Sequence, residues 1–176
     1  MKNFPIEHEG KTYWISRAVA VAGYVFDYCD GKLFVLAAKR GKGSSDFQGY
    51  WNIPCGYLDF DETTAEACCR ELDEETNLKI YPNNLHLFDV EDSPTANKQN
   101  VTFRYWTYST FYYKNQNVYA KGEEEDEVEE VKWIPIEELD QYEFAFNQKK
   151  TIGKIVSTYL YTLVPKQVLL NLTTNV

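Results

Sequence analysis

Hydrophobic and polar side chains follow two different patterns along the chain, and together they predict both strands and helices. Apolar, small and β-branched side chains fill residues 17–26 and 33–38 almost without interruption, which is typical of buried strands. Turn residues occupy positions 29–31 between them, so the two segments are expected to form a hairpin. A Gly- and Ser-rich loop at residues 41–49 and a short extended segment at residues 50–54 follow.

A helix is predicted over residues 63–76, which contain strong helix formers and neither Gly nor Pro. Its apolar side chains recur at i, i+3, i+4 and i+7, which gives one apolar stripe. The stripe consists of Ala65, Cys68, Cys69 and Leu72. Thr63 or Thr64 can cap the first turn, with Glu66 close by. Asn77 is a plausible left-handed residue to close the helix.

The rest of the chain predicts more strands and one more helix. Strands are expected at residues 85–91, 101–113 and 131–134, with an acidic loop at 122–130 and a helical turn at 135–139. Apolar positions repeat at helical spacing near the end of the chain; they are Ile152, Ile155, Val156, Tyr159, Leu160 and Leu163. Residues 166–176 are expected to form a peripheral tail.

The composition indicates one folded domain. The chain has 176 residues, of which 44% are hydrophobic and 26% charged, as in ordinary globular proteins. Neither a repeat nor a linker divides it, so a single domain over residues 1–176 is expected. Residues 1–10 lack the apolar segment of a signal peptide, and no apolar run reaches the length of a membrane span. A cytoplasmic protein without a membrane partner is therefore predicted.

Charge and cysteine content narrow the possible partners. The formal charge of −9 disfavours binding to a nucleic acid polymer, which requires Lys and Arg against phosphate. The four cysteines form no C-x-x-C pair and only two histidines are present, so free thiols and no zinc site are expected. Cys68 and Cys69 are expected to be buried. Aromatic residues make up 16% of the chain; they suit strands, and some could instead stack on a base.

The predicted helix at residues 63–76 carries the candidate chemistry. Residues three and four apart share a helix face, so Glu71 lies beside Glu74 and Glu75. A solvated acidic face, with Arg70 paired to Glu74, is one interpretation. The other follows from Gly56, which lets the backbone approach an ion closely just before the helix. A backbone carbonyl and several carboxylates form a ligand set that Mg²⁺ accepts.

Residues 56–78 resemble the Nudix box. The pattern is Gly, five residues, Glu, seven residues, Arg-Glu, an apolar residue, any residue, Glu-Glu, any residue, Gly and an apolar residue. Every fixed position matches except the last Gly, which is Asn77 here. Two further departures are Cys55 and Asp61, where glycines are common in the family. None of the three removes a carboxylate, and Asn tolerates positive φ well.

The resemblance implies an α/β (α+β) fold, a Nudix-type three-layer α/β/α sandwich with a mixed central sheet. It implies Mg²⁺ as cofactor, with Mn²⁺ as a substitute, and a homodimer as one possible assembly. The implied metal ligands are Glu71, Glu74, Glu75 and the Cys55 carbonyl. Arg70 and Glu62 would pair and orient the helix carboxylates.

The implied chemistry is hydrolysis of a diphosphate linkage by a water that cations activate. A carboxylate must take the proton. Glu71 is a candidate base within the box, and Glu127, from the acidic loop, is our choice outside it; a solvated charge run is the equal alternative. Lys39 and Arg40 could touch phosphate, although solvated strand-end cations are the simpler interpretation.

The predicted substrate is ADP-ribose or a related ADP-sugar. Pro94, 16 residues beyond Leu78, resembles a feature of ADP-ribose-cleaving Nudix proteins. The segment at residues 144–147 resembles one found in Nudix proteins that handle nicotinamide-related nucleotides. A strand-ending proline and core phenylalanines are the alternatives, and the S-Q-P-W motif of NADH-cleaving relatives is absent.

Three other functions compete with this one. A nucleoside triphosphate pyrophosphohydrolase is the closest alternative. A non-catalytic Nudix-like nucleotide-sugar sensor would usually lack box carboxylates, which this chain keeps. A globular protein with a merely solvated acidic helix is the third.

Overall fold

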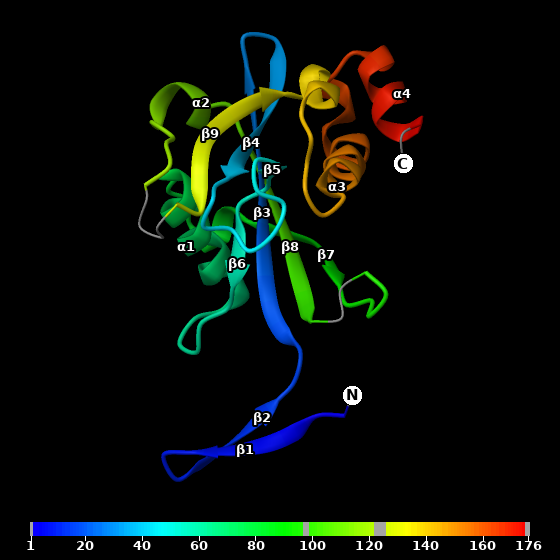
Figure 1. Ribbon diagram of the computed structural model, residues 1–176. Coiled ribbons are helices and arrows are strands. Elements are labelled where there is room, and N and C mark those ends of the chain that lie inside the picture. The colour runs from blue at the N-terminus through cyan, green and yellow to red at the C-terminus, as the bar shows by residue number, and fades with distance from the viewer. Residues whose placement is uncertain (1, 97–98, 122–125, 175–176) are drawn as a thin grey trace.

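A mixed sheet lies at the centre of the protein. The computed structural model describes residues 2–96, 99–121 and 126–174, and in this part a seven-stranded sheet runs between helices (Figure 1). Five strands lie in the order β5-β4-β3-β8-β7, while β6 pairs with β3 and β9 pairs with β4. The strands are β3 (Ala18–Cys29), β4 (Lys32–Arg40), β5 (Trp51–Asn52), β6 (Cys55–Tyr57), β7 (His86–Glu91), β8 (Asn100–Ser109) and β9 (Val128–Pro135). Strands β3 and β8 are parallel, whereas the other named strand pairs are antiparallel.

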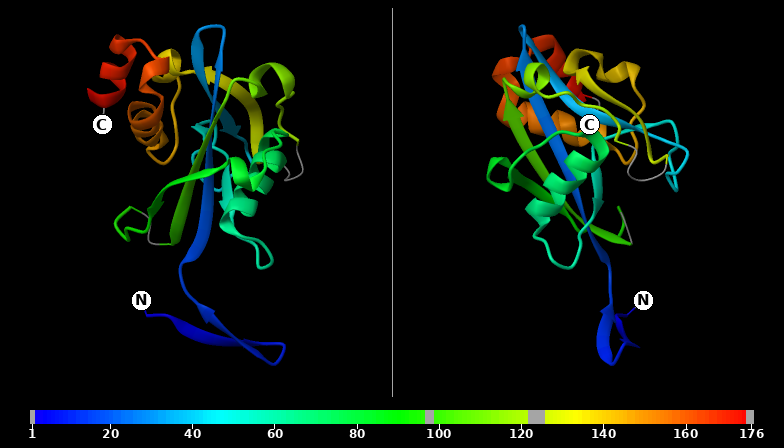
Figure 2. Two further views of the ribbon diagram at one scale, coloured as in Figure 1. Left: turned by 180° about the vertical axis from the view of Figure 1, so that it is seen from behind. Right: turned by 90° about the vertical axis from the view of Figure 1, so that its left-hand side faces the viewer.

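Helices cover both faces of this sheet (Figures 1 and 2). Side chains alternate along β3, so that Val21 and Val25 pack on the side of α1 (Thr64–Thr76). Tyr24 and Phe26 point the other way, into a core shared with α3 (Gln148–Ile155). The predicted α/β fold with a mixed central sheet between two helical layers is confirmed.

The hairpin predicted at residues 17–26 and 33–38 is present as β3 and β4, but the strand predicted to reach residue 113 is shorter. Strand β8 ends at Ser109, and Tyr112–Asn115 form a short helix, α2. The reason is a distant contact: the buried carboxylate of Asp27 accepts a hydrogen bond from the Tyr112 amide at 2.8 Å. This interaction satisfies the first turn of α2, and the aromatic pattern alone did not reveal it.

The C-terminal region also differs from the prediction. The helix is regular only in α3; a π-helical turn, η3 (Val156–Leu160), and a 3-10 turn, η4 (Tyr161–Leu163), follow it. The segment expected to be a peripheral tail contains helix α4 (Lys166–Thr174), which packs against α3. Gly153 allows this close packing, because a Cβ there would lie 2.9 Å from the carbonyl oxygen of Leu172.

An N-terminal hairpin, β1 (Phe4–His8) and β2 (Lys11–Ile15), extends away from the sheet (Figures 1 and 2). No strand was predicted in this part of the chain. None of the helices described is long and apolar enough to cross a membrane. All four cysteines are free, as predicted.

Candidate metal and diphosphate site

Helix α1 begins and ends where its sequence predicts. Thr63 caps the first turn by accepting from the Glu66 amide, and the Glu66 side chain accepts in return from the Thr63 amide. Asn77 adopts the left-handed conformation at φ 58° and closes the helix. Because both ends of the helix are fixed, the positions of the acidic side chains along it are fixed as well.

The buried face of α1 is rotated from the predicted stripe. Its buried residues are Ala67, Cys68, Leu72 and Thr76, whereas Ala65 and Cys69 are only partly buried. The expected burial is therefore right for Cys68 and wrong for Cys69. Contact with β3 explains the rotation, because a Cβ at Gly23 would lie 3.0 Å from both Cys68 Sγ and Leu72 Cδ1. The helix thus rests directly on the backbone of β3.

Arg70 binds several carboxylates at once. Its guanidinium donates to Glu62 at 2.7 and 3.1 Å, to Glu71 at 2.8 Å and to Glu74 at 2.8 Å, and it also reaches the Tyr57 carbonyl at 2.9 Å. These hydrogen bonds lower the pKa of Glu62 and raise the pKa of Arg70. The predicted Arg70–Glu62 pairing is present, and the same guanidinium also fixes two carboxylates of the helix.

Glu71 lies directly against the backbone of β6. A Cβ added at Gly56 would overlap the Glu71 carboxylate, so glycine is needed at this position for the carboxylate to lie where it does. The first glycine of the box therefore has a specific role here, which is to leave space for one acidic side chain.

Glu75 is the most deeply placed carboxylate of the cluster. One oxygen, Oε1, accepts from the Cys55 amide at 3.1 Å. The other, Oε2, is buried and has no hydrogen-bond partner among the described residues. Burial, and then the charges of Glu71 and Glu127, raise the pKa of Glu75 well above its usual value, although the Cys55 amide and Arg40 act in the opposite direction.

The donor set fits a divalent cation. Among the described residues, no three acidic, thiol or imidazole side chains stand together as a ready metal-ligand group, and Arg70 pairs with Glu71 and Glu74. A buried carboxylate oxygen without a partner is nevertheless costly, and a cation would satisfy it. Hard oxygen donors of this kind are those that Mg²⁺ prefers. The contact seen at Cys55 comes from its amide, so a role for its carbonyl stays a prediction.

Glu127 is held beside this cluster by the Gly-rich loop. Its carbonyl accepts from the Gly41 amide at 2.7 Å and from Ser44 Oγ at 3.1 Å. Its side chain is exposed, and its charge is close enough to influence Glu75. Residues 122–125 of the predicted acidic loop lie outside the described part of the chain.

Arg40 is not the solvated strand-end cation that the sequence favoured. Its side chain is only 15% exposed, pairs with Asp46 at 2.7 Å and lies 5.3 Å from the centre of the Phe146 ring. Its charge also lowers the pKa of Glu75. Lys39, by contrast, points to Glu129 at 2.9 Å. Arg40 thus belongs to the surroundings of the carboxylate cluster.

Pro94 and the segment at residues 144–147, which the sequence linked to substrate choice, lie in different parts of the structure. Pro94 is exposed in the turn after β7, where it follows the end of that strand. Phe144 packs partly against the core, as expected, but Phe146 is exposed and contacts Phe47. Phe47 was not predicted to lie near the site, because its left-handed backbone and its contact with a distant ring leave no sequence pattern.

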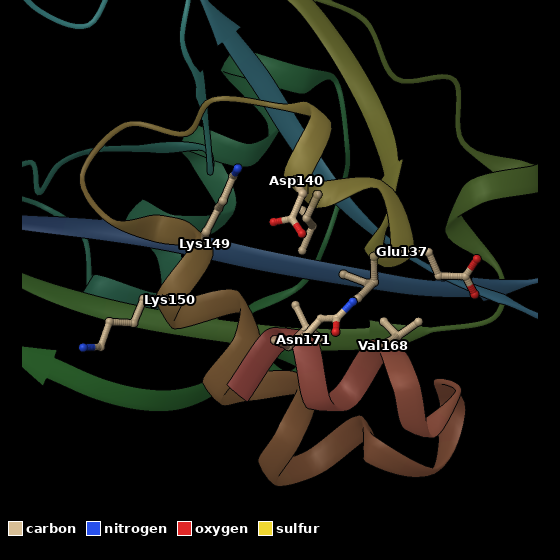
Figure 3. Close-up of a pocket in the computed structure, with 9 residues that line it drawn as sticks. Glu137, Asp140, Lys149, Lys150, Val168 and Asn171 are labelled. Atoms are coloured by element: carbon tan, nitrogen blue, oxygen red, sulfur yellow. The ribbon is translucent and has the colours of Figure 1, made fainter. Parts of the chain in front are cut away.

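A pocket of the described part of the chain lies away from these residues, between η2 (Ile136–Gln141) and helices α3 and α4 (Figure 3). Its polar lining residues are Glu137, Asp140, Lys149, Lys150 and Asn171. None of the predicted site residues lines it, and we assign it no part in the chemistry.

Fold and site together define a class of protein: an α/β domain in which one capped helix directs several carboxylates toward a strand and its neighbouring loop. Such clusters suit divalent cations, and bound cations can in turn attract phosphate groups. A model of the family described as NUDIX domain matches residues 16–154. The chain therefore belongs to the Nudix family, as the resemblance of residues 56–78 predicted, and the prediction of a Nudix hydrolase is confirmed at this level.

Solved structures share the fold at low sequence identity. The NUDIX domain of Shewanella oneidensis NrtR, complexed with ADP ribose, has a TM-score of 0.67 and 23% identity, over 80% of this chain and 86% of that one. A bifunctional NMN adenylyltransferase/ADP ribose pyrophosphatase from Francisella tularensis has a TM-score of 0.67 and 20% identity. The match covers 81% of this chain but only 41% of that protein. A MutT structure from work on the Aliivibrio salmonicida and Vibrio cholerae proteins has a TM-score of 0.58 and 18% identity, over 82% of this chain and 100% of that one.

Proposed function

We propose that the protein hydrolyses a diphosphate linkage in a nucleoside diphosphate-linked substrate, with ADP-ribose or a related ADP-sugar as the substrate class. The observation that carries this proposal is the buried Glu75 carboxylate, with one unsatisfied oxygen beside Glu71 and Glu127. A carboxylate cluster of this kind repels a diphosphate unless cations neutralise the charges of both. A hydrolase that requires divalent cations accounts for both the unsatisfied Glu75 oxygen and the concentration of negative charge.

The residues of the cluster have distinct proposed roles. Glu71, Glu74 and Glu75, with the Cys55 carbonyl, would hold the cation. Mg²⁺ would neutralise the diphosphate and increase the acidity of a water. Arg70 and Glu62 would keep the helix carboxylates in position.

The bond that breaks joins phosphorus to the bridging oxygen of the diphosphate. Water attacks that phosphorus, and a carboxylate takes the proton that water releases. Glu127 is the proposed base, because its loop holds it close to Glu75 from outside the helix. Glu71 is the alternative within the box. From ADP-ribose the products would be AMP and ribose 5-phosphate.

Two structural neighbours support this substrate class and ion type. One was solved with ADP ribose, and a structure of the Francisella tularensis protein contains AMP and a Mn ion. We propose Mg²⁺ as the working ion, with Mn²⁺ as a substitute. We also propose that the protein is cytoplasmic and forms a homodimer. Its substrates would be small nucleotides rather than nucleic acid polymers.

The test is product chromatography on a panel of nucleotides with Mg²⁺. Release of AMP and ribose 5-phosphate from ADP-ribose would support the proposed substrate. Pyrophosphate release from a nucleoside triphosphate, with ADP-ribose untouched, would instead favour a triphosphate pyrophosphohydrolase. Tight binding of ADP-ribose without turnover would indicate a sensor.

A further inference from the structure

Three exposed aromatic rings gather near Arg40, whose charge acts on Glu75. Phe47 and Phe146 have ring centroids 4.8 Å apart, and Phe47 and Tyr50 have centroids 5.6 Å apart. Phe47 is 44% exposed and Phe146 is 45% exposed. We call Phe47, Tyr50 and Phe146 the aromatic rim. Neither of the two buried core clusters includes any of these rings, so packing of the fold does not explain them.

The backbone holds the two phenylalanines in an unusual conformation. Phe47 has φ 49° and Phe146 has φ 55°, a left-handed region that bulky residues rarely adopt. The Phe146 segment is fixed to β5, since the Trp51 amide donates to the Glu143 carbonyl at 2.8 Å and the Ala145 amide donates to the Trp51 carbonyl at 2.9 Å. Residues held in this way are frequently part of ligand sites.

Arg40 connects the aromatic rim to the proposed chemistry. Its guanidinium lies over the Phe146 ring and forms an ion pair with Asp46, from the same loop as Phe47. It stands at the end of β4 and lies near enough to Glu75 to act on its charge. A ligand whose diphosphate meets the carboxylate cluster would therefore have the rim beside it.

We propose that the aromatic rim is the stacking surface for the nucleobase of the substrate. This inference rests on the proposed function and adds the part of the site that would recognise the nucleoside. Every nucleobase can stack on an aromatic side chain, and exposed aromatic rings suit a flat heteroaromatic ligand. The sugar phosphate on the other side of the diphosphate would extend away from the rim.

The experiment measures AMP binding by calorimetry in Mg²⁺, together with kcat and KM for ADP-ribose. Phe47→Leu and Phe146→Leu keep apolar bulk and remove the π-face. Each is expected to weaken AMP binding about tenfold, which is the order of one lost base stack, and to raise KM with kcat little changed. Phe146→Tyr keeps a ring and should bind AMP as the wild type does. Tyr81→Leu removes an exposed ring that does not belong to the rim and should leave AMP affinity, kcat and KM unchanged.

A second measurement needs no variant. Nuclear Overhauser contacts between the H2 and H8 protons of AMP and phenylalanine ring protons are expected in the wild-type protein. Unchanged AMP affinity in both leucine variants, absent ring contacts, or no AMP binding at all would overturn the stacking surface. Rim-dependent AMP binding without hydrolysis of any nucleotide would leave the stacking surface standing and reject the proposed function instead.

Discussion

At the scale of single residues, Glu75 has the least favourable surroundings among the carboxylates of α1. It keeps one hydrogen bond, to the Cys55 amide, while its other oxygen is buried without a described partner. Glu71 and Glu74 are both held by Arg70. A cation would therefore relieve Glu75 more than its neighbours, and this difference can be measured as stability as well as activity.

The variant Glu75→Gln tests this directly. It keeps an acceptor for the Cys55 amide and removes the charge, so turnover should fall by about two to four decades. In EDTA the variant should melt at a higher temperature than the wild type, because an uncompensated buried carboxylate is destabilising. Mg²⁺ should raise the melting temperature of the wild type and hardly affect the variant. Full turnover in the variant, or in EDTA, would contradict the metal assignment.

Arg70 supports a different prediction, about positioning. Arg70→Ala would release Glu62, Glu71 and Glu74 from one shared guanidinium. The free energy of unfolding should therefore fall by about 2 kcal/mol, and turnover should fall as well. Arg70→Lys keeps the charge but not the forked geometry, so it should recover part of both losses. The comparison uses chemical denaturation and steady-state kinetics. Unchanged stability and turnover in Arg70→Ala would show that Arg70 positions nothing.

At this scale the sequence predicted the box residues but not their surroundings. The spacing of Glu62, Arg70, Glu71, Glu74 and Glu75 is local, so the helix repeat was enough to place four of them together. Arg40, Phe47 and Phe146 approach the box only through the fold, and their left-handed or ion-paired states depend on distant atoms. Glu127 was chosen from its acidic loop, and its role as base stays a prediction.

At the scale of elements, the sequence predicted a helix correctly where contacts between neighbouring residues stabilise that helix. The capping box and left-handed Asn77 define α1 through contacts within a few residues. Helix α2 depends instead on Asp27 from another strand, and α4 depends on packing against α3. Those two helices were missed because their stability comes from tertiary contacts rather than from local sequence.

Packing between α3 and α4 gives the third prediction. In an ordinary helix, Gly→Ala stabilises by up to about 1 kcal/mol. Gly153→Ala should instead lower the unfolding free energy by about 1–3 kcal/mol, because the new methyl group would press on the Leu172 carbonyl. Lys154→Ala changes an exposed neighbour on the same helix and serves as the control. A higher melting temperature for Gly153→Ala would show that α4 does not pack there.

At the scale of the whole molecule, topology assembles the site from distant segments. The pairing of β9 with β4 brings Glu127 and the Gly-rich loop together, and it places the charge of Glu127 near Glu75 of α1. Hydrophobic periodicity predicts strands but not which strands pair, so this arrangement could not be derived from the residues. The resemblance to the Nudix box supplied the layered architecture as an expectation, and the structure shows how this chain builds it.

The N-terminal hairpin provides the last prediction, which concerns the proposed homodimer. Isolated two-stranded hairpins are marginal in water, yet β1 and β2 expose Phe4, Ile6, Trp14 and Ile15 and extend away from the sheet (Figure 2). A second copy covering these side chains would stabilise the hairpin by burying apolar area. Removing residues 2–15 should therefore lower the mass measured by light scattering from dimer to monomer, while the melting temperature in Mg²⁺ changes little. Unchanged mass would show that the hairpin is not the dimer contact, and a large fall in melting temperature would show that it packs on the body of its own chain.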